Sequence, residues 1–393
     1  MPLAKHLLEP DYDGSSIINV TASIAAHFGV PTLASPLRQA LPLAGIENIV
    51  LFIVDGFGQW QLEKHLADGD TPNLKTLLEQ SQKHTLTSVF PSTTMSAITG
   101  IHMAASPAQT GWLGYTMWLE EVKRVVEMIG QVDFATREKL EQPDFLKVTT
   151  GIYGALEQRG VRVHSIAPFE YRGTWLNEWY WQGAVQYGYL TANTAPSIVK
   201  NSLTLEGQPK LVVLYFADYD TVCHRYGPSS QSAADEISAI DHVLGRVLRQ
   251  IPKDGKTLFL LTADHGQRDL SDKKAIYLEQ DYALMAMLEG APAGDRVART
   301  LRVKPKYLDA ARERLAQHSD TILAKDAWEI GLFGGSPALN SFYARVGNLI
   351  ALAHTETQLC YTYPNKHPSR PHRGSHGGLS QEEMLVPLVV SRF

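Results

Sequence analysis

The chain has 393 residues, of which 44% are hydrophobic and 20% are charged, and this composition excludes an intrinsically disordered protein. Its formal net charge is −5 with histidine neutral, so it lacks the basic surface of a nucleic-acid-binding protein, and no nucleic-acid polymer is expected as a partner. The length is too great for one simple core and indicates one large α/β domain, residues 1–393, with an insertion.

Short apolar runs rich in β-branched residues recur along the chain, and each is expected to be a strand: 49–54, 161–167, 211–217, 257–263 and 385–390. Each run is apolar on both faces, as in a parallel sheet that helices cover. Helical patterns lie between them. Thr71 is expected to cap a helix that has Pro72 at its first position, and residues 229–251 carry an apolar stripe at helical spacing. The alternation predicts a doubly wound, mostly parallel sheet with helices on both faces.

Acidic and imidazole side chains follow several of these runs. Ligands of open parallel sheets bind beyond the carboxyl ends of the strands, so these side chains are expected to share one edge of the sheet. Aspartate and histidine together suit zinc, and also manganese or iron. Six ligands are too many for one catalytic zinc but fit two ions. The candidate ligands are Asp55, Asp220, His224, Asp264, His265 and His376, with Asp218 expected to be a nearby loop acid.

Each candidate has an ordinary structural explanation when it is taken alone. An aspartate after a strand, such as Asp55, often caps a helix or forms a turn. Gly56 and Gly58 match two glycines of a dinucleotide-binding fingerprint, but Gln61 occupies the third position and no strand-end acid follows about 20 residues later. We therefore reject a dinucleotide site and expect these glycines to turn the backbone beside Asp55.

The segment "TSVFPSTTMSAITG", residues 87–100, contains the candidate nucleophiles. Ser92, Thr93 and Thr94 lead into a predicted helix, and the backbone N–H groups and dipole at a helix N-terminus favour negative charge. One of these residues is expected to be the helix N-cap, which leaves another free to react.

The chain resembles the alkaline phosphatase superfamily, and within it the nucleotide pyrophosphatase/phosphodiesterase (type I phosphodiesterase) branch. The matching motifs occur in the family's order: "IVDGF", "TPNL", "FPSTT…TG", "YxxxxDxxxHxYGP", "ADHG" and "SHGG". The resemblance implies two zinc ions. Asp55, Asp264, His265 and the nucleophile would hold one ion. The other would be held by Asp220, His224 and His376, because Asp220 rather than Asp218 matches the family position.

The nucleophile segment departs from the family pattern. The family's threonine precedes Phe-Pro-Asn-His, whereas Val89 occupies that position here and no asparagine or histidine follows Pro91. Alignment on the following helix favours Thr93 as nucleophile and metal ligand, with Thr94 as the second candidate. The side chain that holds the phosphate is not assigned.

The expected function is a two-zinc hydrolase of small-molecule phosphate esters, diesters or nucleotide pyrophosphates, acting through a phosphothreonine. The alternatives are a phosphomonoesterase, a phosphonate hydrolase, a metal-dependent phosphomutase, or a non-catalytic binding relative. A sulfatase is disfavoured because no Cys/Ser-x-Pro-x-Arg pattern precedes the helix.

Substrate choice is expected to reside in two stretches outside the metal scaffold. Residues 275–370 read as strand–helix–strand–helix and are expected to form a small inserted α+β cap subdomain. Residues 112–200 contain Trp175, Trp179 and Trp181, for which packing is favoured over ligand stacking, and Arg172, which is expected at the surface.

Cysteine usage and hydropathy predict a cytoplasmic protein without membrane association. Cys223 and Cys360 cannot form a disulfide framework for a chain of this size, which fits a reducing compartment. The longest apolar run, at 49–54, is far shorter than the roughly 20 residues of a membrane span. The N-terminal apolar stretch is interrupted by Glu9, Pro10 and Asp11 and is too short for a signal peptide.

Overall fold

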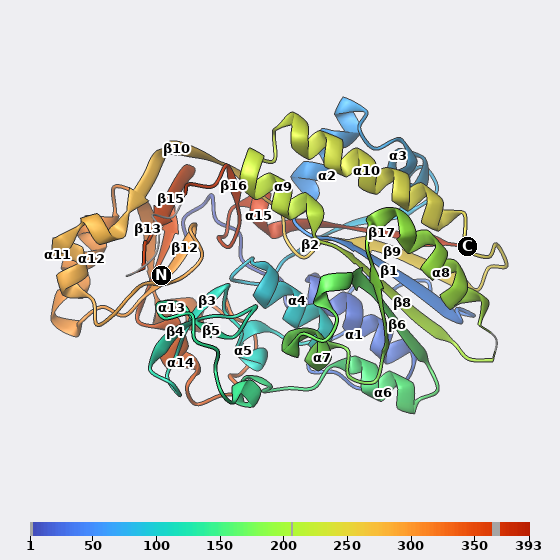
Figure 1. The fold of residues 1–393 in the computed structure, drawn as a ribbon, viewed down its shortest axis with the longest axis horizontal. Coiled ribbons are helices and arrows are strands. Elements are labelled where there is room, and N and C mark those ends of the chain that lie inside the picture. The colour runs from blue at the N-terminus through green and yellow to red at the C-terminus, as the bar shows by residue number, and fades with distance from the viewer. Residues whose placement is uncertain (1–2, 206, 364–369) are drawn as a thin grey trace.

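The computed structural model describes residues 3–205, 207–363 and 370–393. Its centre is a seven-stranded sheet in the order β2-β17-β9-β1-β8-β6-β7 (Figure 1). The strands β1, β6, β7, β8 and β9 run parallel, which confirms the predicted mostly parallel sheet. The seven strands are β1 (Asn48–Val54), β2 (Gln82–Thr87), β6 (Arg162–Pro168), β7 (Val185–Tyr189), β8 (Lys210–Phe216), β9 (Thr257–Thr262) and β17 (Leu385–Arg392).

The direction of β17 corrects one expectation. This strand was expected among the parallel ones, but it lies between β9 and β2 and runs antiparallel to both. It is buried on both faces because helices cover the sheet there, and such burial says nothing of strand direction. Its neighbour β2 was not predicted, because an edge strand with mostly exposed, polar residues lacks the apolar signal.

Helices cover both faces of the sheet (Figure 1). On one face lie α1, α4 and α6, and on the other lie α2, α3, α8, α9 and α10. The helices predicted after Thr71, after the segment Ser92 to Thr94 and within residues 229–251 are present as α3, α4 and α10. Their bounds and those of the others are α1 (Ile17–His27), α2 (Gln59–Asp68), α3 (Pro72–Leu78), α4 (Thr94–Met103), α5 (Pro107–Thr110), α6 (Ile152–Gln158), α7 (Trp175–Tyr180), α8 (Ala195–Thr204), α9 (Asp218–Tyr226), α10 (Gln231–Leu248) and α15 (Gln381–Met384).

The start of α3 shows how distant residues fix a local element. Thr71 is its N-cap and Pro72 its first residue, as predicted, but the Thr71 side chain does not cap the helix. Asp241 of α10 accepts hydrogen bonds from the backbone N–H groups of Asn73 at 3.0 Å and Leu74 at 2.7 Å. A carboxylate at a helix N-terminus satisfies otherwise unpaired donors and favours the helix dipole. This contact ties α3 to α10.

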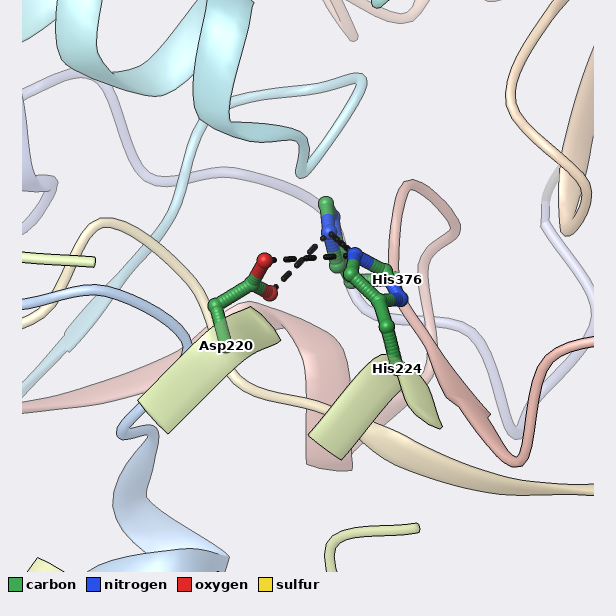
Figure 2. A group of neighbouring side chains, drawn as sticks. All are labelled: Asp220, His224 and His376. Carbon is green, nitrogen blue, oxygen red and sulfur yellow. Dashed lines mark hydrogen bonds and ion pairs between the residues drawn. The ribbon is translucent and has the colours of Figure 1, made fainter. Parts of the chain in front are cut away.

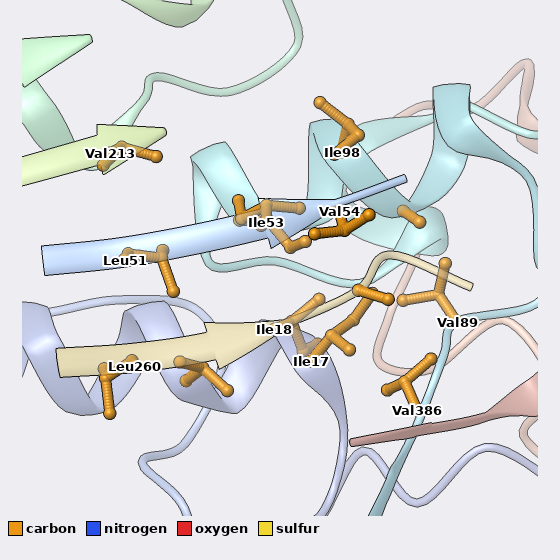
Figure 3. Packing of buried hydrophobic residues seen from close by; sticks show 14 of the residues in the cluster. Ile17, Ile18, Leu51, Ile53, Val54, Val89, Ile98, Val213, Leu260 and Val386 are labelled. Atoms are coloured by element: carbon orange, nitrogen blue, oxygen red, sulfur yellow. The ribbon is translucent and has the colours of Figure 1, made fainter. Parts of the chain in front are cut away.

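The hydrophobic core lies between the sheet and its helices (Figure 3). Ile17 and Ile18 of α1 and Ile98 of α4 pack against the strands β1, β9 and β17. Within the sheet, the rings of Phe52 and Phe216 stack with centroids 4.7 Å apart. Full burial of such a side chain contributes roughly 1.5–3 kcal/mol. The core therefore holds the strand ends, and the residues that follow them, in fixed positions.

A second region begins where β10 (Arg268–Tyr277) leaves the central sheet (Figure 1). β10 pairs in parallel with β15 (Glu356–Cys360) and antiparallel with β16 (Gly374–Ser375). Between β10 and β15 the chain forms a four-stranded antiparallel sheet, and a separate hydrophobic cluster fills this region. Its elements are β11 (Ala293–Gly294), β12 (Ala298–Leu301), β13 (Ser319–Leu323), β14 (Leu349–Ala353), α11 (Tyr282–Met287), α12 (Leu308–Leu315), α13 (Ala324–Glu329) and α14 (Phe342–Val346).

This second region contains the expected strand–helix–strand–helix order, as β12, α12, β13 and α13. Residues 364–369 of the predicted cap subdomain lie outside the described residues. A small antiparallel sheet stands beside it, with strands β3 (Thr116–Leu119), β4 (Arg124–Glu127) and β5 (Val132–Asp133). Hereafter "the cap" means residues 268–363, as the structure describes them.

Across the described ranges, every helix is too short or too polar to cross a lipid bilayer. Cys223 and Cys360 are both free and buried. The cytoplasmic location inferred from the cysteine content stays a prediction.

Candidate active site

The carboxyl ends of three neighbouring strands deliver acidic and imidazole side chains to one place. Asp55 follows β1, and Asp264 and His265 follow β9. After β8 the chain turns at once into α9, where Asp220 and His224 are four residues apart. That spacing puts both side chains on one helix face, with His224 Nε2 at 3.2 Å from Asp220 Oδ2. His376 arrives on the loop between β16 and α15.

The first group consists of Asp220, His224 and His376, here called triad A (Figure 2). Their candidate ligand atoms all lie within 4.8 Å of one another. His376 Nε2 is 3.4 Å from Asp220 Oδ1 and 3.2 Å from His224 Nε2. Two facing ring nitrogens beside a carboxylate form a set of nitrogen and oxygen donors that suits a divalent metal ion.

Backbone carbonyls orient both imidazoles of triad A. His224 Nδ1 lies 2.9 Å from the Gly374 carbonyl oxygen, and His376 Nδ1 lies 3.0 Å from that of Ser92. If each Nδ1–H donates to its carbonyl, each Nε2 is left with a lone pair that points into the triad. The arrangement is the one that metal-binding histidines adopt.

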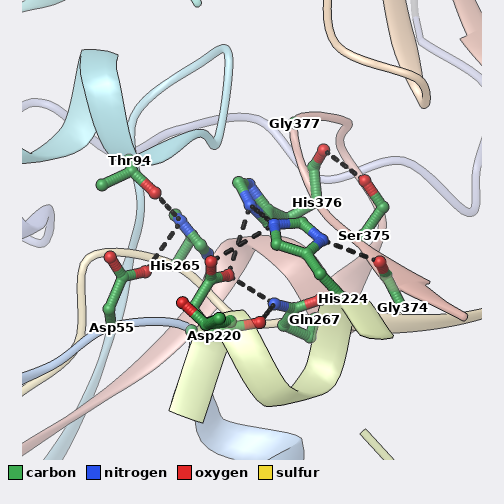
Figure 4. A network of polar contacts seen from close by, with 12 residues as sticks. Asp55, Thr94, Asp220, His224, His265, Gln267, Gly374, Ser375, His376 and Gly377 are labelled. Atoms are coloured by element: carbon green, nitrogen blue, oxygen red, sulfur yellow. Dashed lines mark hydrogen bonds and ion pairs between the residues drawn. The ribbon is translucent and has the colours of Figure 1, made fainter. Parts of the chain in front are cut away.

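The second group, triad B, consists of Asp55, Asp264 and His265. Figure 4 shows Asp55 and His265 of this group. His265 Nε2 is 3.4 Å from Asp55 Oδ1 and 3.2 Å from Asp264 Oδ2. Asp264 Oδ1 accepts hydrogen bonds from the backbone N–H groups of Gly56 and His265. The other oxygens, Asp55 Oδ1 and Asp264 Oδ2, are buried and have no hydrogen-bond partner. Orphaned buried oxygens of this kind fit a cation between them.

The electrostatics of the two triads also favour a cation. Burial raises the pKa of Asp55, and the neighbouring carboxylates of Asp264 and Asp220 raise it further. Burial alone would raise the pKa of Asp220 too, but the charges of His224 and His376 lower it below its usual range. Burial, together with the charge of His265, lowers the pKa of His376. Burial alone would lower the pKa of His224, but the charge of Asp220 and its hydrogen bond raise it. A divalent ion would relieve the repulsion between the crowded carboxylates and would bind these side chains in their deprotonated forms.

The two candidate threonines have different neighbours. Thr94 is the first residue of α4, and its Oγ1 lies 3.1 Å from His265 Nε2 of triad B (Figure 4). Thr93 is the extended N-cap residue and is buried, and its side chain hydrogen-bonds Asp295 of the cap. The structure therefore brings Thr94, the second candidate, to the triads and turns Thr93 toward the cap. Ser92 Oγ donates to the Gly378 carbonyl at 2.7 Å and so supports the loop that carries His376.

Asp218 lies outside both triads. It is the first residue of α9 and is exposed. Burial of its carboxyl group and the charge of Glu170 raise its pKa. The sequence predicted a loop acid near the site, but Asp218 begins helix α9 instead, because the chain turns into this helix directly after β8.

Three polar contacts of the site were not anticipated from the sequence. Gln267 Nε2 donates to Asp220 Oδ1, so the segment after triad B supports a member of triad A (Figure 4). The backbone carbonyl of Gln267 in turn accepts from Gln61 Nε2 at 2.6 Å. Tyr215 of β8 donates its hydroxyl to Asp55 Oδ2. Tyr215 opens the "YxxxxDxxxH" motif, which signals that it belongs to the site, whereas no pattern marks Gln267.

Two cavities meet at Thr94. The larger, of about 510 Å³, is lined by members of both triads and by cap residues. The smaller, of about 150 Å³, is mostly apolar, and its lining includes Met95, Ile98, His102, Leu176, Tyr180 and Trp181. Trp179 and Trp181 are buried, with exposed fractions of 4% and 3%, but Trp181 lines the smaller cavity, so the packing role favoured for them stays a prediction. Arg172 is exposed, as expected.

A mostly parallel sheet with two Asp/His triads beyond its strand ends is an alkaline-phosphatase-like fold. The model of the type I phosphodiesterase/nucleotide pyrophosphatase family matches residues 49–379. The chain therefore belongs to the type I phosphodiesterase/nucleotide pyrophosphatase family, which confirms the resemblance seen in its motifs.

Curated relatives match over a short stretch. Ectonucleotide pyrophosphatase/phosphodiesterase family member 7 of Mus musculus is 33% identical over 79 residues, which cover 19% of this chain and 18% of the relative. The protein of the same name from Rattus norvegicus is 31% identical over 77 residues, with the same two coverages. The matched stretch thus spans less than a fifth of these relatives.

Solved structures match over most of the chain. Murine ectonucleotide pyrophosphatase/phosphodiesterase 5 has a TM-score of 0.65 at 16% identity and covers 87% of each chain, and an inactive form of it was solved with AMP. Phosphonoacetate hydrolase from Sinorhizobium meliloti, in complex with phosphonoformate, has a TM-score of 0.62 at 18% identity and covers 89% of this chain and 91% of its own. At these identities the likeness shows the shared fold.

Proposed function

We propose that the chain is a two-zinc hydrolase of small-molecule phosphodiesters or nucleotide pyrophosphates, and that Thr94 is its nucleophile. The observation that carries this proposal is the contact of 3.1 Å between Thr94 Oγ1 and His265 Nε2, at a cavity that both triads line. Zinc fits the nitrogen and oxygen donors best, while manganese or iron would fit the same ligands.

Each triad would hold one ion. Asp55, Asp264 and His265 would bind one beside Thr94, and Asp220, His224 and His376 would bind the other. Bound ions of this kind lower the pKa of a coordinated hydroxyl and neutralise charge on the transferred phosphoryl group. The six side chains carry three carboxylates, so two divalent ions leave a small positive charge that attracts an anionic ester.

Thr94 is suited to attack phosphorus. Its Oγ1 stands at the N-terminus of the ten-residue helix α4, where free backbone N–H groups and the helix dipole stabilise negative charge. In the first step the Thr94 hydroxyl releases its proton to solvent, and the bond from phosphorus to Thr94 Oγ1 forms as the bond to the leaving oxygen breaks. That oxygen takes the electron pair and leaves on the opposite side. Water then displaces Thr94 and regenerates the hydroxyl.

A panel of p-nitrophenyl monoesters, diesters, phosphonates and sulfates, tested on protein loaded separately with zinc, manganese or iron, tests the proposal. Turnover of diesters above monoesters, dependent on about two ions per chain, is the expected result. Preference for a monoester contradicts the diesterase assignment, and a chain that binds no metal contradicts the two-ion site.

A phosphonate hydrolase is the second candidate. Its support is the fold shared with phosphonoacetate hydrolase, which covers 89% of this chain. Release of inorganic phosphate from phosphonoacetate, without turnover of diesters, is the result that favours this candidate.

A further inference from the structure

The two cavities of the site share a lining around Thr94, here called the junction. The residues that line both cavities are Thr94, Met95, Ile129, Tyr171 and Tyr215. A phosphoryl group that Thr94 attacks has to lie at the junction, because the reacting oxygen and phosphorus atoms start about 3–3.5 Å apart. The side chains of the junction are therefore the ones that can touch the transferred group.

Tyr171 reaches the junction by the same route as the triads. It lies three residues after β6 ends at Pro168, and β6 pairs in parallel with β8. Because parallel strands end at the same edge of a sheet, Tyr171 arrives beside the residues that follow β8. Four neighbouring strands, in the order β9, β1, β8 and β6, thus supply residues to one site.

Local hydrogen bonds hold the backbone of Tyr171. This residue ends the short 3-10 helix η2 (Phe169–Tyr171) and is half-buried. Its carbonyl oxygen accepts hydrogen bonds from the backbone N–H of Thr174 at 3.2 Å and from Thr174 Oγ1 at 2.8 Å. The turn therefore fixes the point from which the Tyr171 side chain leaves the backbone.

A short series of contacts connects Tyr171 with the nucleophile. The rings of Tyr171 and Tyr215 lie side by side, with centroids 6.3 Å apart, and Tyr215 donates its hydroxyl to Asp55. His265 Nε2 is 3.4 Å from Asp55 Oδ1 and 3.1 Å from Thr94 Oγ1. Figure 4 shows Asp55, His265 and Thr94 in this series. Tyr171 and Thr94 thus lie near the same triad.

The Tyr171 hydroxyl is free to donate a hydrogen bond. It has no hydrogen-bond partner within the part of the chain that the structure describes, whereas the Tyr215 hydroxyl is engaged by Asp55. Burial raises the pKa of Tyr171, and the charge of Asp55 raises it further, so the hydroxyl keeps its proton. Since Met95 and Ile129 have no side-chain donor, Tyr171 supplies the free donor of the junction.

Two other donors of the larger cavity belong to the cap and are engaged elsewhere. Arg299 Nε and Nη1 donate to the carbonyl oxygens of Leu359 at 2.8 Å and Gly294 at 3.0 Å. The Tyr363 hydroxyl donates to the carbonyl oxygen of Pro292 at 2.5 Å. Both side chains line the larger cavity but not the smaller one, so neither lies at the junction.

We propose that Tyr171 is a catalytic residue that donates a hydrogen bond to a non-bridging oxygen of the phosphoryl group bound at Thr94. Phosphoryl transfer spreads negative charge over these oxygens, and positioned donors stabilise that charge. The proton stays on Tyr171 throughout. No asparagine follows Pro91 in this chain, so Tyr171 would be the phosphate-holding side chain that the sequence left unassigned. This role rests on the proposed hydrolase function.

Tyr171→Phe tests the contact because it removes the hydroxyl and keeps the ring. Phenyl 4-nitrophenyl phosphate and methyl 4-nitrophenyl phosphate share the leaving group and differ only in the substituent that stays on phosphorus. We expect kcat/KM to fall by about tenfold to 10²-fold for both diesters alike. The metal content should stay at about two ions per chain, because no triad ligand changes.

Tyr282→Phe, at a position of the cap that is 83% exposed, is the matched control. It should change kcat/KM by less than about twofold. Tyr171→Leu, which also removes the ring, separates hydrogen bonding from packing, and circular dichroism checks that each variant is folded.

Three results would overturn the contact. Wild-type activity in Tyr171→Phe, with or without a loss in Tyr171→Leu, would show that other donors hold the phosphoryl oxygens. A loss restricted to the phenyl diester would show that the ring contacts the retained substituent. Loss of a metal ion in Tyr171→Phe would show that Tyr171 acts through the triads.

If the zinc-loaded wild type hydrolyses neither diester, the hydrolase proposal fails first. Calorimetric titration of the zinc-loaded protein with inorganic phosphate then tests the contact separately. Binding that Tyr171→Phe weakens by about tenfold, and that Tyr282→Phe leaves unchanged, supports it. Equal binding by wild type and Tyr171→Phe, or no binding by either, rejects it.

Discussion

The edge of the central sheet and the cap face each other across one cavity, yet they differ in how their chemistry is built. The members of triads A and B each follow a strand end by at most eight residues, so short motifs encode them. The cap residues reach the cavity through pairings of segments far apart in the chain, such as β10 with β15 and β12 with β14. The residues of the triads are therefore encoded by local sequence, whereas the cap residues that line the cavity are brought there by tertiary structure.

The largest effect on activity is expected at two adjacent threonines, of which Thr94 contacts triad B and Thr93 contacts the cap. Thr94→Ala should lower kcat by at least about 10³-fold while both metal ions stay bound, because it removes the nucleophile but no triad ligand. Thr93→Ala loses a hydrogen bond to the cap and should cost less than about tenfold. Steady-state kinetics with metal analysis measures both variants. The reverse ranking would restore Thr93, the candidate that the sequence favoured.

Selective loss of one metal ion should distinguish triad A from triad B. Asp220→Ala removes the carboxylate of triad A and should reduce the metal content from about two ions to about one, with a loss of activity of at least about 10²-fold. Elemental mass spectrometry after desalting measures the ratio. Asp218→Ala, two residues away and exposed, should keep both ions. Loss of both ions in Asp220→Ala would mean that the triads bind metal as one unit.

A smaller effect is expected for Gln267, which belongs to neither triad but donates a hydrogen bond to Asp220 of triad A. Gln267→Leu removes the amide that donates to Asp220 Oδ1 and should weaken metal binding at triad A by about tenfold, because groups that orient a metal ligand typically matter by this much. Competition with a chelator measures the affinity of each ion. If the affinity of triad A for its metal ion is unchanged, Gln267 does not orient Asp220 for metal binding and has only a packing role.

The smallest effect on catalysis is expected at the end of α4 farthest from Thr94. Burial lowers the pKa of His102 to about 3, from an ordinary value near 6.5. Below pH 6.5, His102 is therefore protonated in the unfolded chain but stays neutral in the folded chain. The free energy of unfolding thus decreases as pH falls from 6.5 toward 3. At pH 5 this loss amounts to about 2 kcal/mol.

Replacement of His102 by Gln should flatten this part of the stability profile. Urea unfolding at pH 7 and pH 5 gives the free energy of unfolding for wild type and variant. If the free energy of unfolding falls by the same amount from pH 7 to pH 5 in both proteins, the acid sensitivity comes from other buried histidines.

The sequence supported the fold and the composition of the triads because both depend on local rules. Asp55 and Asp264 follow apolar strands, and parallel strands end at the same edge of the sheet. The direction of β17 could not be predicted, since burial on both faces is equal for either direction. The choice between Thr93 and Thr94 depends on where α4 begins. A shift of one residue decides which threonine contacts His265 and which contacts Asp295. Gln267 and Arg299 follow no pattern that marks their distant partners.

The position of β17 inside the central sheet has a consequence for biosynthesis. Residues 385–392 form a strand between β9 and β2, and the segment just before them carries His376. During translation, β1, β8 and β9 can pair as they emerge, but the sheet keeps a gap between β9 and β2, and triad A lacks one imidazole, until the segment from His376 through β17 has left the ribosome. Until then the nascent chain exposes the unpaired strand edges of β9 and β2, so the sheet and triad A are completed together.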